Sequence, residues 1–339
     1  MNLHAYFTLE DKFIQAQQLA ASLIELAASR GVNKDKLLRG TGIFYEDLSS
    51  DTLLISADQL LKLISKTRQL MAGNATSFLL GQRLFPSNYG AISEALFYAK
   101  NLLDCIHILN SYRCEIAPLL CTNLVWTKHE CIIQFKDAIG CDENFQFLLE
   151  LYCTAIHSSL RYLSNRRVNV AYDFEFSQPR YIQEYEENLG FKINFNRSTN
   201  QIRLARQELV ALLPNYSQVK RDHALHKLAQ QSRYQFGFRE RVIQLIANNS
   251  QLNQADIAEQ LGISNATFKR RLKQHGTRFL ALQDEYHRQR VLSIHCDIQR
   301  SNEDLASRLG FNDVANFRRA FKRWFGLTPS QFKQKFRHG

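Results

Sequence analysis

Two segments near the end of this chain repeat each other in sequence and in spacing. The run AEQLGI at 258–263 returns as ASRLGF at 306–311. The run FKRRLK at 268–273 returns as FRRAFK at 317–322, with one more residue in the turn of the second copy. In each copy the Gly after Leu permits the positive φ at which a helix ends. Each copy therefore predicts two short helices joined by a tight turn.

The residues around each turn are those that a helix-turn-helix unit requires. An Ala in the first helix lets the two helices approach closely, and Ile263 or Phe311 fills the corner between them. Ser264 and Asp313 stand where the second helix needs an N-cap. A single turn of this kind is common in helical proteins. Two such turns at matching positions of a repeat, each followed by a basic helix, favour DNA binding.

The spacing of apolar residues separates two faces of each second helix. Phe268 and Leu272 lie four residues apart, as do Phe317 and Phe321, so these pairs are predicted to face the core. Small residues near a helix start let it enter a groove, Arg and Lys reach guanine, and Asn reads adenine. The alternative is a charged face that only keeps the protein soluble. The opposite faces carry Ala266, Lys269, Arg270 and Lys273 in the first copy, and Ala315, Asn316, Arg318, Arg319 and Lys322 in the second.

The segment between the two copies is predicted to be one amphipathic helix over Arg278–His295. Its apolar side carries Phe279, Leu282, Tyr286 and Val291. At about 1.5 Å per residue it spans roughly 25 Å, close to the ~34 Å between successive major grooves on one face of a duplex. One chain can therefore place both basic helices in adjacent grooves. The run TPSQ at 328–331 predicts a capping box that opens a last helix.

The charge of the chain is concentrated where the repeat lies. The 339 residues carry a formal net charge of +11, and residues 235–339 hold 18 Lys and Arg against 9 Asp and Glu. A basic final third is expected to face a polyanion. No run of about 18 to 20 apolar residues is present for a membrane span, and no signal peptide is visible at the start of the sequence.

The region before the basic third mixes helical and extended patterns. Residues 1–214 are predicted to form an α+β domain, 215–234 a linker, and 235–339 an all-α domain with helix-turn-helix units at 254–275 and 302–325. Helices and strands cluster rather than alternate, which argues against a doubly wound parallel sheet. Helices are predicted over 11–30, 57–71, 76–84, 102–111, 142–163 and 178–189. Strands are predicted over 113–120, 124–128, 131–136 and 168–176, with a hairpin of 192–195 and 201–204.

The C-terminal region closely resembles the DNA-binding domain of AraC/XylS-type transcription regulators. The matching runs within Gln254–Phe336 are DIAEQLGIS, TFKRRLKQHGTRF, LASRLGFND and FRRAFKRWFGLTPSQF. The resemblance implies two recognition helices that read adjacent major grooves. Ala266 departs from the pattern, because some relatives carry a larger contact residue there. By position the resemblance implies base contacts by Ala266, Lys269, Arg270, Ala315, Asn316 and Arg319; cations further along, Lys273, Arg318 and Lys322, are expected at phosphates.

The N-terminal region resembles the arabinose-binding-type regulatory domain of longer family members, such as ornithine-utilisation-type regulators. The resemblance covers roughly residues 20–212 and rests on NYGAISEALFYAKNLLDCIHILNSY and FSQPRYIQEYEENLGFKINFNRSTNQIRLARQEL. It implies effector sensing or dimerisation. It does not identify a sugar as the ligand.

Residues that suggest other chemistry are few. His223 and His226 lack an acidic third ligand and are expected as an exposed pair, and His107 as a buried core histidine. Arg113 is a candidate for binding an anionic effector, although a surface ion pair is the commoner role. Seven cysteines without a CxxC pair are expected to be reduced thiols. No phosphate-binding Gly loop, zinc-protease motif or nucleophile elbow is present.

These observations predict a cytoplasmic, effector-responsive transcription activator that is not an enzyme. Its expected partners are double-stranded DNA, a small-molecule effector, RNA polymerase and a second copy of the chain. No cofactor, metal or membrane is expected. The alternatives are an architectural or nonspecific DNA-binding protein, a DNA reader attached to an enzyme, and a sensor that only dimerises.

Overall fold

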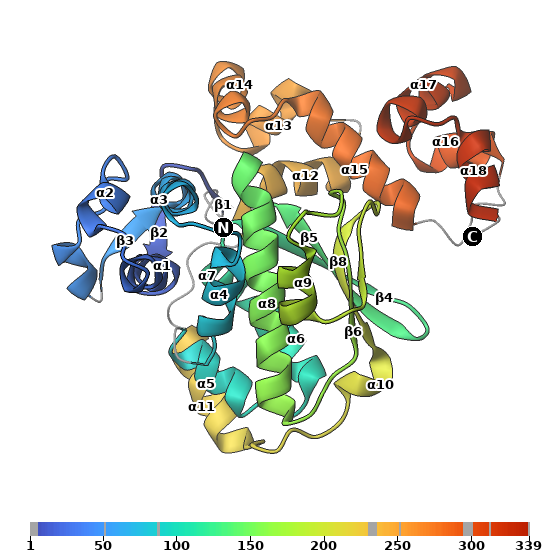
Figure 1. Ribbon diagram of the computed structural model, residues 1–339. Helices are drawn as coiled ribbons and strands as arrows, with labels where there is room; N and C mark the ends of the chain where they lie inside the picture. The colour runs from blue at the N-terminus through green and yellow to red at the C-terminus, as the bar shows by residue number, and fades with distance from the viewer. Residues whose placement is uncertain are drawn as a thin grey trace. The chain divides into compact units, whose positions relative to one another are not determined.

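The computed structural model describes residues 6–50, 52–86, 89–229, 236–250, 252–293, 301–311 and 313–337. The chain divides into two compact units, one over residues 5–237 and the other beginning at Phe238 (Figure 1). The first is mixed α+β and the second is helical, which confirms the predicted fold class. No helix in the described ranges is both long and apolar enough to cross a bilayer.

A five-stranded sheet forms the centre of the N-terminal unit. Its strands lie in the order β4 (Leu120–Trp126), β5 (Glu130–Asp137), β8 (Asn200–Ala205), β6 (Val170–Asp173) and β7 (Ile193–Asn194). All neighbours are antiparallel except β6 and β7. The predicted hairpin of 192–195 and 201–204 is therefore wrong, because β6 lies between β7 and β8. Two short pairs lie outside this sheet, β1 (Tyr6–Phe7) with β9 (Phe236–Gly237) and β2 (Lys12–Gln15) with β3 (Leu54–Ser56).

Two further segments differ from the predicted elements. The predicted strand over 113–120 begins as a helical turn, α7 (Arg113–Ile116), in which Ala117 N donates to Arg113 O at 2.7 Å. The predicted helix over 11–30 starts only at Leu19, because residues 12–15 pair with β3. Ser56 caps α3 (Ala57–Leu70) through a capping box with Gln59, so this helix begins where it was predicted.

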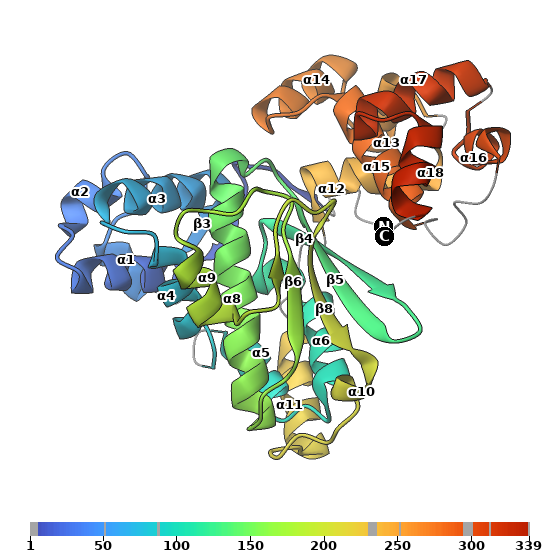
Figure 2. The same ribbon diagram turned by 45° about the vertical axis from the view of Figure 1, so that its right-hand side comes forward.

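The long helix α8 (Phe145–Ser164) runs along one face of the sheet with α9 (Ile182–Leu189) beside it (Figures 1 and 2). The predicted helix over 178–189 thus begins later, at Ile182. His157 Nδ1 lies 2.9 Å from the Tyr172 hydroxyl, which joins α8 to β6. A Cβ at Gly81 would lie 2.4 Å from Leu151 O, so only glycine lets α4 (Thr76–Arg83) pack this closely on α8. The other helices of this unit are α1 (Leu19–Ser29), α2 (Lys34–Leu38), α4 (Thr76–Arg83), α5 (Ala91–Phe97), α6 (Leu102–Ser111), α10 (Arg206–Leu209) and α11 (Gln218–Ala229).

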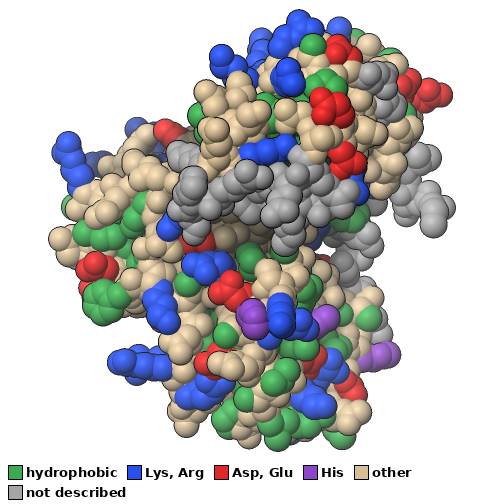
Figure 3. Space-filling view, turned by 90° about the vertical axis from the view of Figure 1, so that its right-hand side faces the viewer, with side chains coloured by type: hydrophobic (Ala, Val, Ile, Leu, Met, Phe, Trp, Pro, Cys, Tyr) green, Lys and Arg blue, Asp and Glu red, His purple; other side chains and the backbone are tan. Residues whose placement is uncertain are grey.

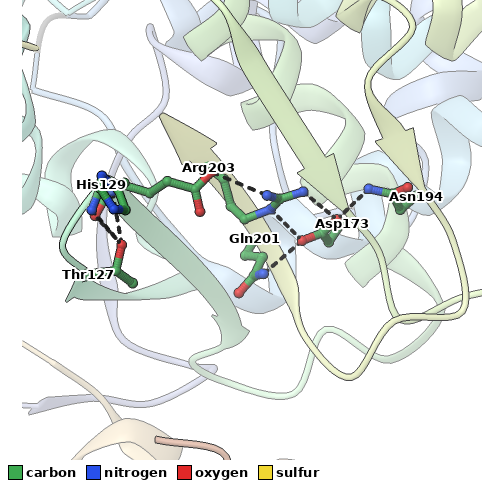
Figure 4. A network of polar contacts seen from close by, with 7 residues as sticks. Thr127, His129, Asp173, Asn194, Gln201 and Arg203 are labelled. Atoms are coloured by element: carbon green, nitrogen blue, oxygen red, sulfur yellow. Dashed lines mark hydrogen bonds and ion pairs between the residues drawn. The ribbon is translucent and has the colours of Figure 1, made fainter. Parts of the chain in front are cut away.

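The carboxylate of Asp173 ties three strands of the sheet together (Figure 4). It accepts from Gln201 Nε2 at 2.8 Å, from Asn194 Nδ2 at 2.8 Å and from Arg203 Nε at 2.9 Å. Burial by itself raises the pKa of Asp173, but these hydrogen bonds outweigh burial and lower the pKa below its usual value. The charged form of Asp173 thus bridges β6, β7 and β8.

The segment predicted as a linker, 215–234, contains a helix that belongs to the N-terminal unit. Ala224 and Leu228 of α11 are buried in the core of that unit. Arg221 binds Asp104 of α6 through Nε and Nη2, each 2.6 Å from a carboxylate oxygen. The N-terminal unit therefore extends beyond residue 214. The polar composition of α11 hid two buried residues four positions apart.

The C-terminal unit consists of helices and tight turns over its described residues. They are α12 (Phe238–Asn248), α13 (Gln254–Gln260), α14 (Asn265–Gln274), α15 (Phe279–Ser293), α16 (Asn302–Arg308), α17 (Val314–Phe325) and α18 (Pro329–Arg337). The α13–α14 and α16–α17 pairs occupy the positions of the two sequence repeats, and α15 is the helix between them.

Candidate nucleic-acid interface

The first repeat folds into the turn that its residues predict. Gly262 has a φ of +68°, which ends α13. Ser264 then caps α14, because its side chain accepts from the Thr267 backbone N–H at 3.2 Å. Phe268 and Leu272 are buried, and the Phe268 ring lies 6.0 Å from that of Phe238 of α12. The inner face of α14 is thereby fixed to the helix that begins the unit.

The second repeat uses the same geometry with a more aromatic core. Gly310 has a φ of +78°, and Asp313 caps α17 by accepting from the Ala315 N–H at 2.7 Å. Phe317 and Phe321 are buried with ring centroids 5.5 Å apart. The remaining buried members of this core are Val291, Leu305, Ala306, Leu309, Ala320, Trp324 and Phe332. Both predicted core pairs are thus confirmed.

Every residue predicted to contact DNA is exposed on the face opposite these cores. The exposed set comprises Ala266, Lys269, Arg270, Lys273, Ala315, Asn316, Arg318, Arg319 and Lys322. Figure 3 shows Lys and Arg side chains gathered at the top of the view, over the C-terminal helices. Within the described residues no carboxylate forms an ion pair with Lys269, Arg270, Lys273 or Lys322. Their positive charge is therefore open to an external anion.

Asn316 and Arg319 are linked on the exposed face of α17. Arg319 Nη2 donates to Asn316 Oδ1 at 2.6 Å. Asn is the side chain that reads adenine in two contacts, and Arg the one that reads guanine. Their hydrogen bond places the two groups side by side near the start of the helix, where a base reader enters the groove.

Asp284 fixes the spacer helix α15 to the second helix-turn-helix unit. Its Oδ1 accepts from Trp324 Nε1 at 2.8 Å and from Arg323 Nη2 at 2.5 Å, and its Oδ2 accepts from Arg323 Nε at 2.7 Å. One turn later, His287 stacks on Trp324 with centroids 5.3 Å apart and rings inclined by 16°. Sequence reasoning assigned no role to Asp284 or His287. The only indication in the sequence was that both residues lie on the polar side of a predicted helix that precedes the aromatic-rich second helix-turn-helix unit.

Helix α15 also contacts the first helix-turn-helix unit and the helix before it. Phe279, at the start of α15, lies 6.2 Å from Phe268 of α14 between ring centroids. Arg239 of α12 and Glu285 of α15 form an ion pair at 3.6 Å. The spacer helix thus packs against elements of both helix-turn-helix units.

Thr328 and Gln331 form the predicted capping box, with hydrogen bonds of 2.9 and 3.3 Å, and open α18.

The candidates for other chemistry belong to the N-terminal unit. Arg113 lies in α7, not in a strand, with its Cζ 5.5 Å from the centre of the Phe236 ring. His223 and His226 are exposed on α11 as predicted, whereas His107 is exposed and not a core residue. The described residues contain no group of three or more His, Cys, Asp or Glu side chains placed to hold a metal ion.

The six cysteines within the described ranges are free thiols. Cys105, Cys131, Cys141 and Cys153 are buried, while Cys296 lies outside the described residues. Burial raises the pKa of Cys105 to about 12 and that of Cys131 to about 11. A thiol with a raised pKa is a poor nucleophile at neutral pH. These two side chains therefore give no support to an enzyme built on an activated cysteine.

The fold and the paired basic helices agree with the comparison with known families. Residues 31–211 match the model of the arabinose-binding domain at the N-terminus of AraC transcription regulators. The chain belongs to the AraC family of transcription regulators. A helix-turn-helix domain model matches residues 257–335, and a winged helix-turn-helix DNA-binding model matches 237–274. This AraC-family protein is thus a DNA-binding regulator with an N-terminal ligand-binding domain, as the sequence resemblance predicted.

Relatives of this AraC-family chain are similar to it over both units. The ornithine utilization regulator of Pseudomonas aeruginosa is 24% identical over 323 residues, which cover 93% of this chain and 95% of the relative. An uncharacterized HTH-type transcriptional regulator of Mycobacterium tuberculosis is 23% identical over 331 residues, or 92% and 94% of the two chains. The crystal structure of the regulator CdpR from P. aeruginosa aligns with 94% of this chain and 98% of its own at 16% identity and a TM-score of 0.45.

Proposed function

We propose that α14 and α17 enter two adjacent major grooves of one DNA duplex. The observation that carries this proposal is the pairing of an exposed small-and-basic face with a buried aromatic face on both helices. The 15 residues of α15 span about 22 Å, which is of the same order as the ~34 Å between successive grooves. The hydrogen bonds that Asp284 accepts from α17 support a fixed spacing between the two readers.

Two classes of contact follow from the positions of the exposed side chains. Residues near the start of each helix are assigned to base edges: Ala266, Lys269 and Arg270 of α14, and Ala315, Asn316 and Arg319 of α17. Cations toward the helix end or the flank are assigned to phosphates: Lys273, Arg318 and Lys322. The small side chain of Ala266 lets the helix approach the base edges closely but offers no hydrogen bond. Base readout by α14 therefore rests on Lys269 and Arg270.

The N-terminal domain is proposed to sense a small-molecule effector and to form a homodimer in the cytoplasm. Effector binding would then control promoter occupancy or contact with RNA polymerase, with activation as the outcome. The division into residues 1–214, a linker over 215–234 and a DNA-binding domain over 235–339 is modified in this proposal. Helix α11 belongs with the sensing unit, because its Ala224 and Leu228 are buried there.

Selection of bound sequences from a random DNA pool tests the proposal with the full-length protein. Two conserved blocks in each half-site, about one helical turn apart, are expected, and footprinting should protect two adjacent major grooves. Affinity should also fall steeply as salt rises, because phosphate contacts release counterions. Equal affinity for selected and random DNA would favour an architectural protein instead. Affinity that does not change with salt would overturn DNA binding through the basic faces.

A further inference from the structure

A cavity of about 320 Å³ lies in the N-terminal unit between α3, α4, α8 and the residues before α9. This volume falls within the roughly 300–1,000 Å³ typical of small-molecule sites. The side chains of Arg68, Gln69 and Glu143 line it and are exposed, whereas those of Ser77 and Glu150 line it and are buried. The cavity therefore leads from solvent to a buried carboxylate.

Glu150 is 3% exposed, and its carboxylate accepts four hydrogen bonds. Ser77 Oγ donates to Oε2 at 2.6 Å, while Oε1 accepts from Tyr185 OH at 2.5 Å, Tyr181 OH at 2.9 Å and Gln146 Nε2 at 3.0 Å. Burial, followed by the nearby charge of Glu150, raises the pKa of both tyrosines far above the ordinary value. Both hydroxyls therefore keep their protons and act as donors.

All four partners of Glu150 are neutral. Among the described residues no Lys, Arg or His forms an ion pair with it. A buried carboxylate without a cation is unfavourable, because hydrogen bonds from neutral groups do not cancel its charge. Oε2 accepts only the Ser77 bond from described residues, and a carboxylate oxygen has capacity for more than one donor. Glu150 is thus suited to receive a positively charged group from the cavity.

The Arg68 guanidinium at the exposed side of the cavity is held in place, and no carboxylate of the described residues forms an ion pair with it. Arg68 Nη1 donates to Glu143 O at 2.9 Å and to Asn144 Oδ1 at 3.0 Å. Both acceptors are neutral oxygens. A guanidinium carries five N–H groups, and no described residue accepts a hydrogen bond from Nε or Nη2, so these donors are available to an anion. The cavity therefore presents the buried carboxylate of Glu150 and, at its exposed side, the guanidinium of Arg68 and the carboxylate of Glu143.

We propose that this cavity binds a small zwitterion, with its ammonium group against Glu150 and its carboxylate against Arg68. The inference deepens the proposed effector-sensing role of the N-terminal domain and names the chemical class of the effector. Arg113, the candidate from the sequence, is not among the described residues that line this cavity. A purely structural role for the Glu150 network is the competing explanation, and binding measurements separate the two.

The test is isothermal titration of the full-length protein with a set of defined compounds. A series of ω-amino acids, β-alanine, γ-aminobutyrate and 5-aminovalerate, varies the distance between the two charges. Comparison with n-butylamine, butyrate and L-arabinose isolates the cation, the anion and a neutral polyol. At least one ω-amino acid is expected to bind, more tightly than n-butylamine and much more tightly than butyrate or L-arabinose. Failure of every amine in the set to bind overturns the proposal.

Two variants assign the ends of the ligand. Glu150→Gln keeps the shape of the side chain and removes its charge, so affinity for each binding amine should fall about 10- to 100-fold. Arg68→Gln should lower affinity for the ω-amino acid toward that of n-butylamine and leave n-butylamine binding unchanged. Arg83→Gln, exposed on α4 and not lining the cavity, is the matched control and should change neither. Unchanged binding by both cavity variants would overturn the assignment.

DNA binding is measured separately so that the two proposals fail independently. Circular dichroism first establishes that Glu150→Gln is folded; Arg68 is exposed, so Arg68→Gln keeps the test valid if Glu150→Gln is not. Amine binding without sequence-specific DNA binding would contradict the proposed reader and leave the cavity assignment standing. Sequence-specific DNA binding without amine binding would do the reverse.

Discussion

The guanidinium of Arg319 donates a 2.6 Å hydrogen bond from Nη2 to Oδ1 of Asn316, three residues earlier on α17. Both side chains are exposed, and the opposite face of the helix is fixed by Phe317, Phe321 and Trp324. The bond restricts two flexible side chains before any DNA arrives. It therefore lowers the entropy that base contacts by this pair would otherwise cost.

The first prediction concerns base readout by Arg319. Arg319→Ala should weaken binding to the selected DNA sequence by about 1–3 kcal/mol and relax specificity at one base position, because the proposed bidentate contact to guanine would be lost. Binding is measured by mobility shift against the selected site and against each single-base variant of it. A similar loss on selected and random DNA would make Arg319 a phosphate contact.

The second prediction concerns phosphate binding by Lys322. Lys322→Ala should weaken binding to selected and random DNA alike and reduce the slope of log affinity against log salt by about 1. The slope is measured between about 50 and 200 mM salt, the range over which counterion release is strong. Arg83→Ala, in the N-terminal unit, is the control and should leave the slope unchanged. A sequence-dependent effect would instead move Lys322 to the base-reading set.

The C-terminal unit could be predicted in detail because its signals are local. Gly310 ends one helix, Asp313 caps the next, and Phe317 and Phe321 face inward, all within 12 residues of chain. Each of these rules involves residues a few positions apart, so a single sequence contains all the information. Asp284 and Trp324, which share a hydrogen bond, lie 40 residues apart in the chain, and the periodicity of the sequence gave no indication of this contact.

The N-terminal unit was predicted less well because its decisive contacts are distant in sequence. Strand β7 pairs with β6, although β8 follows it along the chain after a short turn. Glu150 looks like any polar residue of an amphipathic helix, and only the fold brings Ser77, Tyr181 and Tyr185 around it. The pattern therefore predicted the fold class but not the strand pairing or the cavity.

The third prediction concerns the attachment of α15 to α17. Asp284→Asn should destabilise the C-terminal unit by about 1–3 kcal/mol, because it weakens charge-assisted hydrogen bonds to Arg323 and the bond to buried Trp324. Urea unfolding of the full chain, followed by Trp fluorescence, measures the change. Asp58→Asn is the control, since its pair with Lys62 is an exposed i,i+4 contact and should contribute at most a few tenths of a kcal/mol.

Loss of this attachment should also change how DNA is bound. If α15 sets the spacing of the two readers, Asp284→Asn should reduce affinity for the complete selected site more than for a site that keeps only one block. Equal reductions on both sites would show that the spacing does not depend on Asp284.

The fourth prediction concerns the attachment of α11 to the N-terminal unit. Arg221→Gln removes the paired hydrogen bonds to Asp104, and protease cleavage and amide exchange within α11 should increase several-fold. Burial raises the pKa of Asp104, but the contacts of its carboxylate outweigh burial and lower the pKa below its usual value. The hydrogen bonds from Arg221 are the largest of these lowering contributions. The pKa of Asp104 should therefore rise in the variant. Exchange in α11 that equals the wild-type rate would show that the bonds between Arg221 and Asp104 do not hold this helix in place.

The last prediction concerns acid sensitivity of the contact between His287 and Trp324. Burial first, and then the charge of Arg290, lowers the pKa of His287 to about 4, and its Nδ1 is buried without a hydrogen-bond partner among the described residues. The unfolded chain has an imidazole pKa of about 6.5, so below that pH it binds a proton that the folded state does not. The stability that neutral His287 contributes is complete above pH ~6.5 and is lost as the pH falls toward about 4.

His287→Phe keeps an aromatic ring against Trp324 and removes this titration. Urea unfolding between pH 7 and pH 4, in a Trp126→Phe background so that Trp324 is the only reporter, should show a smaller loss of stability for the variant than for the parent chain. Carboxylates titrate in the same range in both proteins, so the difference between the two curves is the quantity that matters. Parallel curves would mean that His287 is equally ready to accept a proton in the folded and unfolded chain, and that burial against Trp324 does not disfavour its charged form.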